Sequence, residues 1–256
     1  MLPYISIFGW EAPMYGLMCI AGIAAVAAFV LLRKKRLGIP NDDLLHIAIY
    51  CAIGALVGAK ALYIITILPA PGVIAAISKN PALLMDILQQ GFVFYGGLLG
   101  ALFMMWLYCR KYKADFEAGC SLFAEAAPLF HVFGRIGCFF AGCCYGIESR
   151  WGIAFHDAPT APNGVPLLPV QLVEAALNAL LFAASVIYQR KKRPPYAALK
   201  LYLASYAAIR FTLEYFRGDA IRGRFLIFST SQWIALAVML TIAAAIVRAH
   251  VPQKRR

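Results

Sequence analysis

The sequence predicts an all-α integral membrane protein, a single helical domain over residues 1–256 with seven transmembrane helices. Apolar residues make up 62% of the chain and charged residues only 14%, whereas soluble domains carry roughly 25% charged residues. Nearly uncharged stretches of about 20 residues, the length of a membrane span, recur along the sequence. Basic clusters follow alternate stretches, as expected for a protein that orients itself in a bilayer.

Seven apolar stretches account for the predicted spans. They cover residues 13–32, 44–68, 91–109, 116–134, 170–189, 196–216 and 225–247. The first, third and seventh stretches carry no charged residue, which makes them the plainest candidates for transmembrane helices. The segment 69–90 is rich in proline and apolar residues, so we expect it to lie along the membrane interface. The segment 145–169 is rich in proline and glycine, which predicts an irregular loop.

The distribution of basic residues predicts the orientation of the spans. Clusters follow the first, third, fifth and seventh spans, at residues 33–36, 110–113, 190–193 and 248–256. Because cytoplasmic loops carry an excess of Lys and Arg, we expect the N-terminus outside and the C-terminus in the cytoplasm. The cluster after the first span argues against a cleavable signal peptide, in which the positive residues come first. Clusters at span ends do not follow a phosphate backbone, so the net charge of +12 does not indicate nucleic-acid binding.

Seven ionisable side chains lie within the predicted spans or at their ends. They are Lys60, Glu125, His131, Arg135, Glu174, Arg210 and Glu214. Each charge near the bilayer centre costs about 2.5–3.5 kcal/mol on insertion scales, so we expect these groups to face the interior of the helix bundle or a wet cavity. Three acids and three bases, the histidine aside, permit full pairing. Two interpretations therefore stay open: structural ion pairs, or a polar cavity for a charged substrate.

Two groups of polar residues repeat a helical spacing. The first group is His131, Arg135 and Cys138, and the second is Arg210, Glu214 and Arg217. Residues three or four apart share one face of a helix, so each group predicts a stripe toward the outer end of its span. Arg210 and Glu214 are also placed to pair simply with each other. Two arginines that converge near the outer leaflet suit an anionic phosphate, because a guanidinium can bind two oxygens at once.

Three of the seven cysteines gather after the fourth span, at Cys138, Cys143 and Cys144. We consider three interpretations for them: packing residues in a tight turn, a disulfide, or a reactive thiolate beside Arg135. A metal site with His131 is disfavoured, because the spacing matches no common zinc pattern. We therefore predict no metal and no cofactor. The other four cysteines lie in apolar spans and are expected to be small core residues.

Six short motifs, in order along nearly the whole chain, resemble those of the bacterial prolipoprotein diacylglyceryl transferases. They are Y-G-L-M at 15–18, Y-G-G-L at 95–98, G-R-I-G-C-F at 134–139, P-V-Q-L-V-E at 169–174, R-F-T-L-E-Y-F-R at 210–217 and S-Q-W at 231–233. The corresponding family motifs are Y-G-L-M, H-G-G-L, G-R-x-G-N-F, P-S-Q-L-Y-E, R-x-x-x-E-x-F-R and S-x-G-Q. The resemblance implies a multi-pass enzyme of the bacterial cytoplasmic (inner) membrane.

The resemblance also implies a reaction, that of a phospholipid-dependent transferase of lipoprotein biosynthesis. The enzyme would move the diacylglyceryl group of phosphatidylglycerol to the thiol of a preprolipoprotein cysteine and release glycerol phosphate. Its partners would be phosphatidylglycerol, a secreted preprolipoprotein and membrane lipids. Two alternatives stay open: a paralogue that transfers to a glycan or peptide acceptor, and a non-catalytic lipid-binding or transport protein.

The resemblance assigns roles to individual residues. Arg135 and Arg210 would be catalytic residues that hold the phosphate, and Glu214 would orient Arg210. The substrate-binding residues would be Tyr15, Tyr95, Gly96, Gly97, Gln171, Glu174, Cys138 and Arg217.

Three positions depart from the family pattern. Tyr95 stands where the family has a histidine, Cys138 stands at the signature asparagine, and Cys143 stands at a later acidic residue. We therefore expect His131 to be the catalytic base, because an imidazole with an ordinary pKa of about 6.5 suits proton transfer near neutral pH. The phenol of Tyr95 is a poor base at that pH, so we expect it to position the donor lipid.

Overall fold

The computed structural model describes residues 3–7, 9–68, 72–89, 91–219 and 224–250. The chain forms two compact units. The larger unit comprises Met1–Arg33 and Ser121–Arg256, and the smaller unit comprises Lys34–Cys120.

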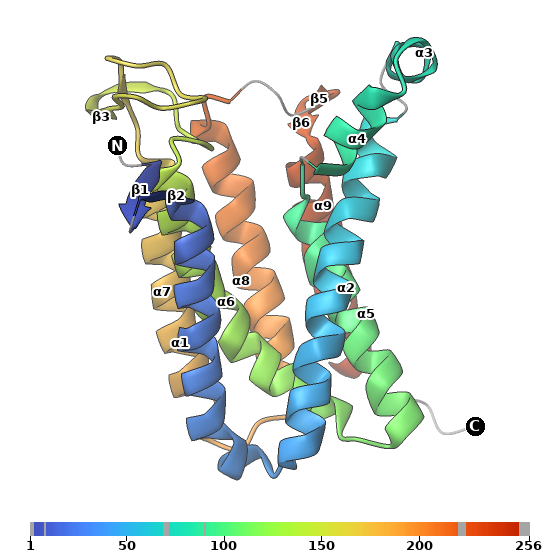
Figure 1. Cartoon of the computed structure of the whole chain (residues 1–256). Coiled ribbons are helices and arrows are strands. Elements are labelled where there is room, and N and C mark those ends of the chain that lie inside the picture. Colours follow the sequence, from blue (N-terminus) through green and yellow to red (C-terminus); the bar gives the residue numbers. More distant parts are fainter. Residues whose placement is uncertain (1–2, 8, 69–71, 90, 220–223, 251–256) are drawn as a thin grey trace. The chain divides into compact units, whose positions relative to one another are not determined.

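The described residues are mostly helical (Figure 1). The helices are α1 (Met14–Leu37), α2 (Asn41–Ile67), α3 (Val73–Lys79), α4 (Ala82–Gln89), α5 (Phe94–Tyr112), α6 (Phe116–Phe140), α7 (Val170–Tyr188), α8 (Ala197–Leu213), the 3-10 turn η1 (Glu214–Phe216) and α9 (Thr230–His250). Among these residues, five helices are long and apolar enough to cross a membrane, namely α1, α2, α6, α7 and α9. The predicted third and sixth spans form α5, of 19 residues, and α8, of 17 residues. The helical membrane-protein class is therefore confirmed, with five helices rather than seven that meet this measure.

Three small sheets were not predicted from the sequence. Each is a pair of antiparallel strands: β1 (Tyr4–Ile7) with β2 (Trp10–Pro13), β3 (Glu148–Ala154) with β4 (Pro166–Leu167), and β5 (Arg224–Phe225) with β6 (Phe228–Ser229). The segment 145–169 is thus not wholly irregular. It also has a small core of its own, in which Phe155 and Leu167 are buried.

The last helix begins later than the sequence predicts, at Thr230 rather than at residue 225. The β5–β6 hairpin occupies residues 224–229, directly before the helix. A capping box then starts the helix. The Ser229 amide donates to the Gln232 side chain (3.0 Å), and the Gln232 amide donates to the Ser229 hydroxyl (3.3 Å).

In the smaller unit, α2 and α5 lie side by side with their backbones in contact (Figure 1). Glycines make this approach possible. A Cβ on Gly54 would lie 2.7 Å from the carbonyl carbon of Gly100, and a Cβ on Gly96 would lie 2.9 Å from that of Gly58. Small residues at regular spacing are the usual means of close helix packing in membranes. Gly96 therefore has a packing role in the α2–α5 contact.

Lys60, also in the smaller unit, contacts backbone carbonyls and an aromatic ring. Its ammonium donates to the carbonyls of Ile87 (3.3 Å) and Gly91 (3.0 Å), and it lies 4.3 Å from the centre of the Phe92 ring. Carbonyl dipoles and an aromatic face both stabilise a cation away from water. These contacts help to hold the charge of Lys60 within the predicted second span.

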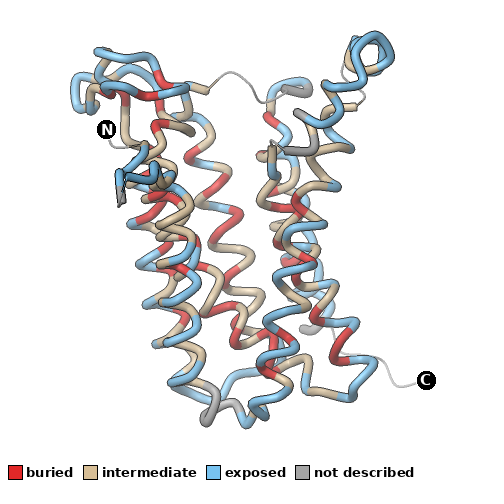
Figure 2. Tube along the Cα trace, viewed as in Figure 1, coloured by how far each residue is buried: buried red, intermediate tan, exposed pale blue. Residues whose placement is uncertain are grey.

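In the larger unit, buried positions follow α6, α7 and α8 (Figure 2). Helix α1 packs on α6, where a Cβ on Gly137 would lie 3.1 Å from side-chain atoms of Tyr15 and Met18. Arg33 and Glu125 form a two-fold ion pair between these helices, with Arg33 Nε 3.0 Å from Glu125 Oε2. Glu125 thus takes its partner from the first basic cluster rather than from another intramembrane base.

Candidate active site

Helix α6 supplies the first group of site residues. It continues to Phe140, past the predicted end of the fourth span, so His131, Arg135 and Cys138 share one face as predicted. His131 and Arg135 are buried, with 6% and 8% of their surface exposed. The sequence therefore identified this stripe correctly from spacing alone.

Helix α7 supplies the counter-charge for α6. The carboxylate of Glu174, which is fully buried, lies 3.0 Å from Arg135 Nη2 and 3.9 Å from His131 Nε2. The Asn178 side chain donates to the Glu174 carbonyl at 2.8 Å. Asn178 was missed in the sequence, although a polar amide one turn after Glu174 in an apolar stretch is a usable signal.

Gln171, one turn before Glu174, ties α7 to the turn that follows α6. Its amide donates to the Cys143 carbonyl at 2.7 Å, and its side chain is fully buried. A buried amide paired in this way fixes the position of the turn. Gln171 therefore acts on the cysteine-bearing segment.

Helix α8 supplies the second arginine. Arg210 Nη2 lies 2.5 Å from Glu214 Oε2, so the simple pairing considered from the sequence does occur. The same nitrogen donates to the Ser231 hydroxyl at 3.5 Å. One turn earlier, the ring of Tyr206 lies 4.9 Å from the ring of His131. Tyr206 was missed, although its spacing of four residues from Arg210 places it on the same face.

Arg217 does not extend the α8 stripe, contrary to the sequence prediction. Helix α8 ends at Leu213, η1 follows, and Arg217 has an extended backbone with φ −83° and ψ 137°. Residues 145–147 pair with this segment: the Ile147 amide donates to the Phe216 carbonyl (3.0 Å), and the Gly218 amide donates to the Tyr145 carbonyl (3.0 Å). These backbone hydrogen bonds, on either side of Arg217, hold it in an extended conformation rather than a helical one. We call this pairing of residues 145–147 with 216–218 the backbone seam.

The seam gives Arg217 a partner that the sequence did not predict. Its guanidinium binds both oxygens of Asp219, with Nε–Oδ1 at 2.8 Å and Nη2–Oδ2 at 2.6 Å. Burial lowers the pKa of Arg217, but the bonds to Asp219 outweigh it and raise the pKa above its ordinary value. Arg217 therefore stays charged at every physiological pH.

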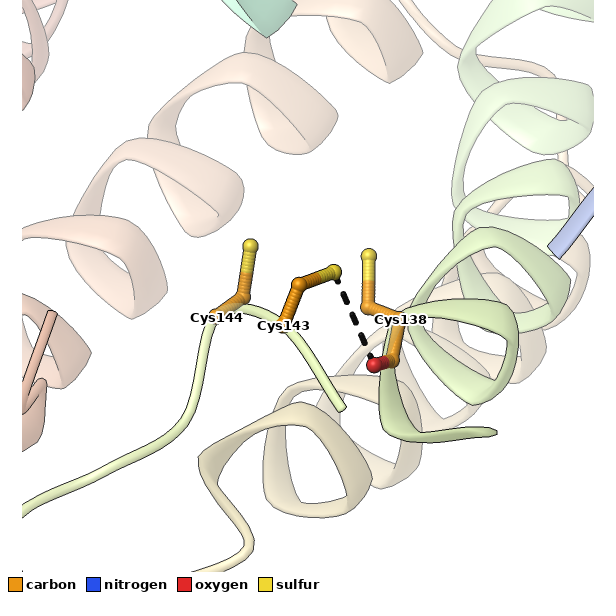
Figure 3. Close-up of side chains that lie close together, drawn as sticks. All are labelled: Cys138, Cys143 and Cys144. Atoms are coloured by element: carbon orange, nitrogen blue, oxygen red, sulfur yellow. Dashed lines mark hydrogen bonds between the residues drawn. The ribbon is translucent and has the colours of Figure 1, made fainter. Parts of the chain in front are cut away.

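The cysteine cluster consists of Cys138 in the last turn of α6 and Cys143 and Cys144 in the turn after it (Figure 3). Their three Sγ atoms lie within 4.8 Å of one another. All seven cysteines of the chain are free, so the disulfide interpretation is not realised here. Left-handed backbone at Gly142 (φ 65°) and Cys144 (φ 61°) turns the chain back toward α6.

The thiols outside the helix differ in acidity. The neighbouring Cys138 and Cys143 thiols stabilise the thiolate of Cys144, as do the nearby Arg217 and Arg135, so the pKa of the Cys144 thiol is lowered. At Cys143, the Cys138 side chain lowers the pKa of the thiol. The Cys144 side chain and burial together raise it by more, so the pKa of Cys143 is raised to about 11. The cluster therefore favours one thiolate, located at Cys144.

Three guanidinium groups of the site each have one nitrogen without a hydrogen-bond acceptor among the described residues. Within the described part of the chain, Arg135 Nε, Arg210 Nη1 and Arg217 Nη1 are buried and have no acceptor. Each arginine is at the same time held by a carboxylate through another nitrogen. Buried donors of this kind require a partner, and an anionic group with several oxygens would supply it.

The remaining predicted residues belong to α1 and α5. Tyr15, at the start of α1, packs against α6 at Gly137. Tyr95, Gly96 and Gly97 belong to α5 of the smaller unit, where Tyr95 is buried.

The chain is similar to known proteins over most of its length. The family model described as "Prolipoprotein diacylglyceryl transferase" matches residues 3–248. A protein of Clostridium tetani named phosphatidylglycerol–prolipoprotein diacylglyceryl transferase is 36% identical over 92% of this chain and 92% of its own length. A second such transferase, from Clostridium perfringens, is 33% identical over 92% of this chain and 90% of its own. A third such transferase, from Geobacter sulfurreducens, is 31% identical over 81% of this chain and 78% of its own length.

Proposed function

We propose that this chain, which belongs to the prolipoprotein diacylglyceryl transferase family, transfers the diacylglyceryl group of phosphatidylglycerol to a prolipoprotein thiol at the site of α6, α7 and α8. The sulfur of the acceptor cysteine forms a bond to the glyceryl carbon. The bond from that carbon to the phosphate oxygen breaks, and glycerol phosphate leaves. The thiol proton passes to a base.

The observation that carries this proposal is the set of three buried arginines with unused donors. Arg135, Arg210 and Arg217 bind the phosphate of the donor lipid through these donors, which no described residue accepts from. Negative charge grows on the phosphate as the bond to carbon breaks. Fixed guanidinium groups stabilise that charge without reorganising, which lowers the barrier. Glu174, Glu214 and Asp219 hold the arginines in place.

His131 is the group that accepts the thiol proton in this proposal. It lies on the same face of α6 as Arg135, and four charged or titratable groups face it: Arg135, Glu174, Tyr206 and Arg210. We assign the proton transfer to its imidazole, because histidine is the side chain that most often serves as a general base. Tyr95 positions the donor lipid.

Seven spans, with α5 and α8 among them, complete the proposal. The N-terminus lies outside, the C-terminus in the cytoplasm, and the protein resides in the bacterial inner membrane. The alternate basic clusters of the sequence support this orientation. The site then opens toward the outer leaflet, where a secreted prolipoprotein presents its cysteine.

The reaction is tested with the full chain in vesicles of phosphatidylglycerol and a peptide that carries a lipobox cysteine. Mass spectrometry is expected to show the peptide gaining one diacylglyceryl group, with release of glycerol phosphate. The same peptide with serine in place of cysteine, and vesicles without phosphatidylglycerol, are the controls. A peptide that stays unmodified would contradict the proposed acceptor, and absence of glycerol phosphate release would contradict the donor chemistry as well.

A further inference from the structure

The proposed transfer assigns no chemical step to the thiols of the cysteine cluster, yet their geometry is that of a ligand set. Cys138 comes from α6, and Cys143 and Cys144 come from the turn after it. The three side chains lie close together, and the Cys143 thiol donates to the Cys138 carbonyl at 3.6 Å (Figure 3). All three Sγ atoms lie within 4.8 Å of one another. Packing alone does not require three thiols to converge in this way.

The spacing of the sulfurs suits a single metal ion. A metal–sulfur bond of about 2.3 Å places three thiolates around one ion roughly 4 Å apart. The separation of the three sulfurs therefore needs only small side-chain rotations to close on an ion. Thiolates select soft or borderline ions such as Zn²⁺, Cd²⁺ and Cu⁺ over Mg²⁺ or Ca²⁺.

The charges around the cluster favour the binding of a metal ion by its thiolates. Three thiolates and one divalent ion carry a net charge of −1. Arg135 interacts electrostatically with Cys138 and Cys144, and Arg217 interacts with Cys144. These two guanidinium groups offset the negative charge of a metal–thiolate centre.

We propose that Cys138, Cys143 and Cys144 form a binding site for one thiophilic divalent metal ion, with Zn²⁺ as the physiological candidate. Each thiol that binds as a thiolate releases its proton to solvent. The sequence spacing did not suggest this site, because the usual zinc patterns need a histidine or a fourth cysteine at set positions. The three sulfurs come together only through the turn at Gly142 and Cys144.

A metal ion at this site also regulates the transferase, and this second statement rests on the proposed function. The metal–thiolate centre attracts Arg135 and Arg217, the same groups that bind the lipid phosphate. A bound ion therefore competes with the donor lipid for their charge, and we expect it to inhibit transfer.

Binding is tested on the purified full chain under reducing conditions, with Cd²⁺ as a spectroscopic probe. The expected result is one Cd²⁺ per chain with a thiolate-to-metal charge-transfer band in the ultraviolet. Cys138→Ser, Cys143→Ser and Cys144→Ser should each weaken binding at least tenfold. Cys51→Ser, a cysteine of the smaller unit, is the matched control and should bind Cd²⁺ as the parental chain does. Circular dichroism verifies that each variant is folded, and the alanine variants repeat the test for any that is not.

Two outcomes would overturn the metal site: parental Cd²⁺ affinity in all three cluster variants, or equal loss in Cys51→Ser. The inhibition is measured separately, as the ratio of lipid transfer with and without Zn²⁺, and a chelator should restore transfer. Binding without inhibition would contradict only the regulatory statement. A chain that binds Cd²⁺ but never transfers lipid would contradict the proposed function and leave the metal site standing.

Discussion

Each arginine of the site is bound by an acid through one part of its guanidinium and keeps another part free. Arg135 pairs with Glu174, and Arg210 pairs with Glu214. The pairing offsets the cost of burying the charge, which would otherwise amount to several kcal/mol per ion. The planar fork of a guanidinium makes this double use possible, whereas an ammonium presents a single point charge.

Replacing these arginines by lysine is therefore expected to reduce lipid transfer while keeping the charge. Arg135→Lys and Arg210→Lys should each lower turnover at least tenfold, which corresponds to about 1.4 kcal/mol of transition-state stabilisation. Arg33→Lys is the matched control, because Arg33 is also paired with a buried acid but lies outside the site. Turnover is measured with the vesicle and peptide assay. Parental rates in both site variants would show that the two arginines are structural.

The role of His131 in proton transfer has a test that separates turnover from binding. Glutamine is polar but cannot accept the thiol proton. His131→Gln is therefore expected to slow turnover while the donor lipid still binds. His46→Gln, in the smaller unit, is the control and should turn over at the parental rate. Parental turnover in His131→Gln would show that His131 has no part in proton transfer.

Spacing along a single helix predicted part of the site, and contacts between distant segments could not be predicted in the same way. The i, i+4 spacing gave His131 with Arg135, and Arg210 with Glu214, because both are local to one helix. The partner of Glu125 is 92 residues away, at Arg33. No rule on spacing selects such a partner from the basic residues of the chain.

At the scale of elements, α2 and α5 can approach each other closely because the glycines at their contact have no side chain. Gly54→Ala is expected to destabilise the protein by about 1–3 kcal/mol, as overpacking does in closely packed contacts. Its Cβ would meet the backbone of Gly100, which cannot move away as a flexible side chain can. Thermal unfolding of the purified protein provides the measurement.

Gly134→Ala is the matched control for this contact. Nothing lies within 4 Å of a Cβ at Gly134, which is also helical. Alanine there should be neutral or stabilising by up to about 1 kcal/mol, because it reduces the freedom of the unfolded chain. Equal losses of stability in the two variants would contradict a specific role for the α2–α5 contact.

Hydropathy placed the long helices well, but it could not place their ends. The first predicted span, residues 13–32, overlaps α1, because twenty apolar residues have one stable form in a bilayer. The end of α8 at Leu213 depends instead on the backbone seam with residues 145–147. Such pairing joins segments about 70 residues apart, beyond the reach of any local pattern.

At the scale of the whole molecule, the orientation is a prediction that chemical labelling can check. Pro162→Cys and Lys192→Cys place reporters at exposed positions on opposite predicted sides of the membrane. A membrane-impermeant thiol reagent added to intact cells should label Pro162→Cys above the parental background and spare Lys192→Cys. Permeabilised cells provide the control in which both positions react. Labelling of Lys192→Cys alone would reverse the orientation and place the site on the cytoplasmic side.

A second backbone pairing, of residues 146 and 147 with Leu168, affects how far the chain can be altered. The loop from residue 147 to 168 starts and ends at one place, where the Gly146 amide donates to the Leu168 carbonyl (3.0 Å) and the Leu168 amide donates to the Ile147 carbonyl (2.9 Å). Its exposed tip at Gly164 has open space around it. The loop also contacts the site, because the Thr160 hydroxyl donates to the carbonyl of Gly142, in the cysteine-bearing turn, at 2.7 Å. An epitope or fluorescent tag inserted at Gly164 adds little closure entropy, but any force that it exerts on the loop reaches that turn through Thr160. A tag at this position would therefore report on the cysteine-bearing turn as well as serve to capture the protein.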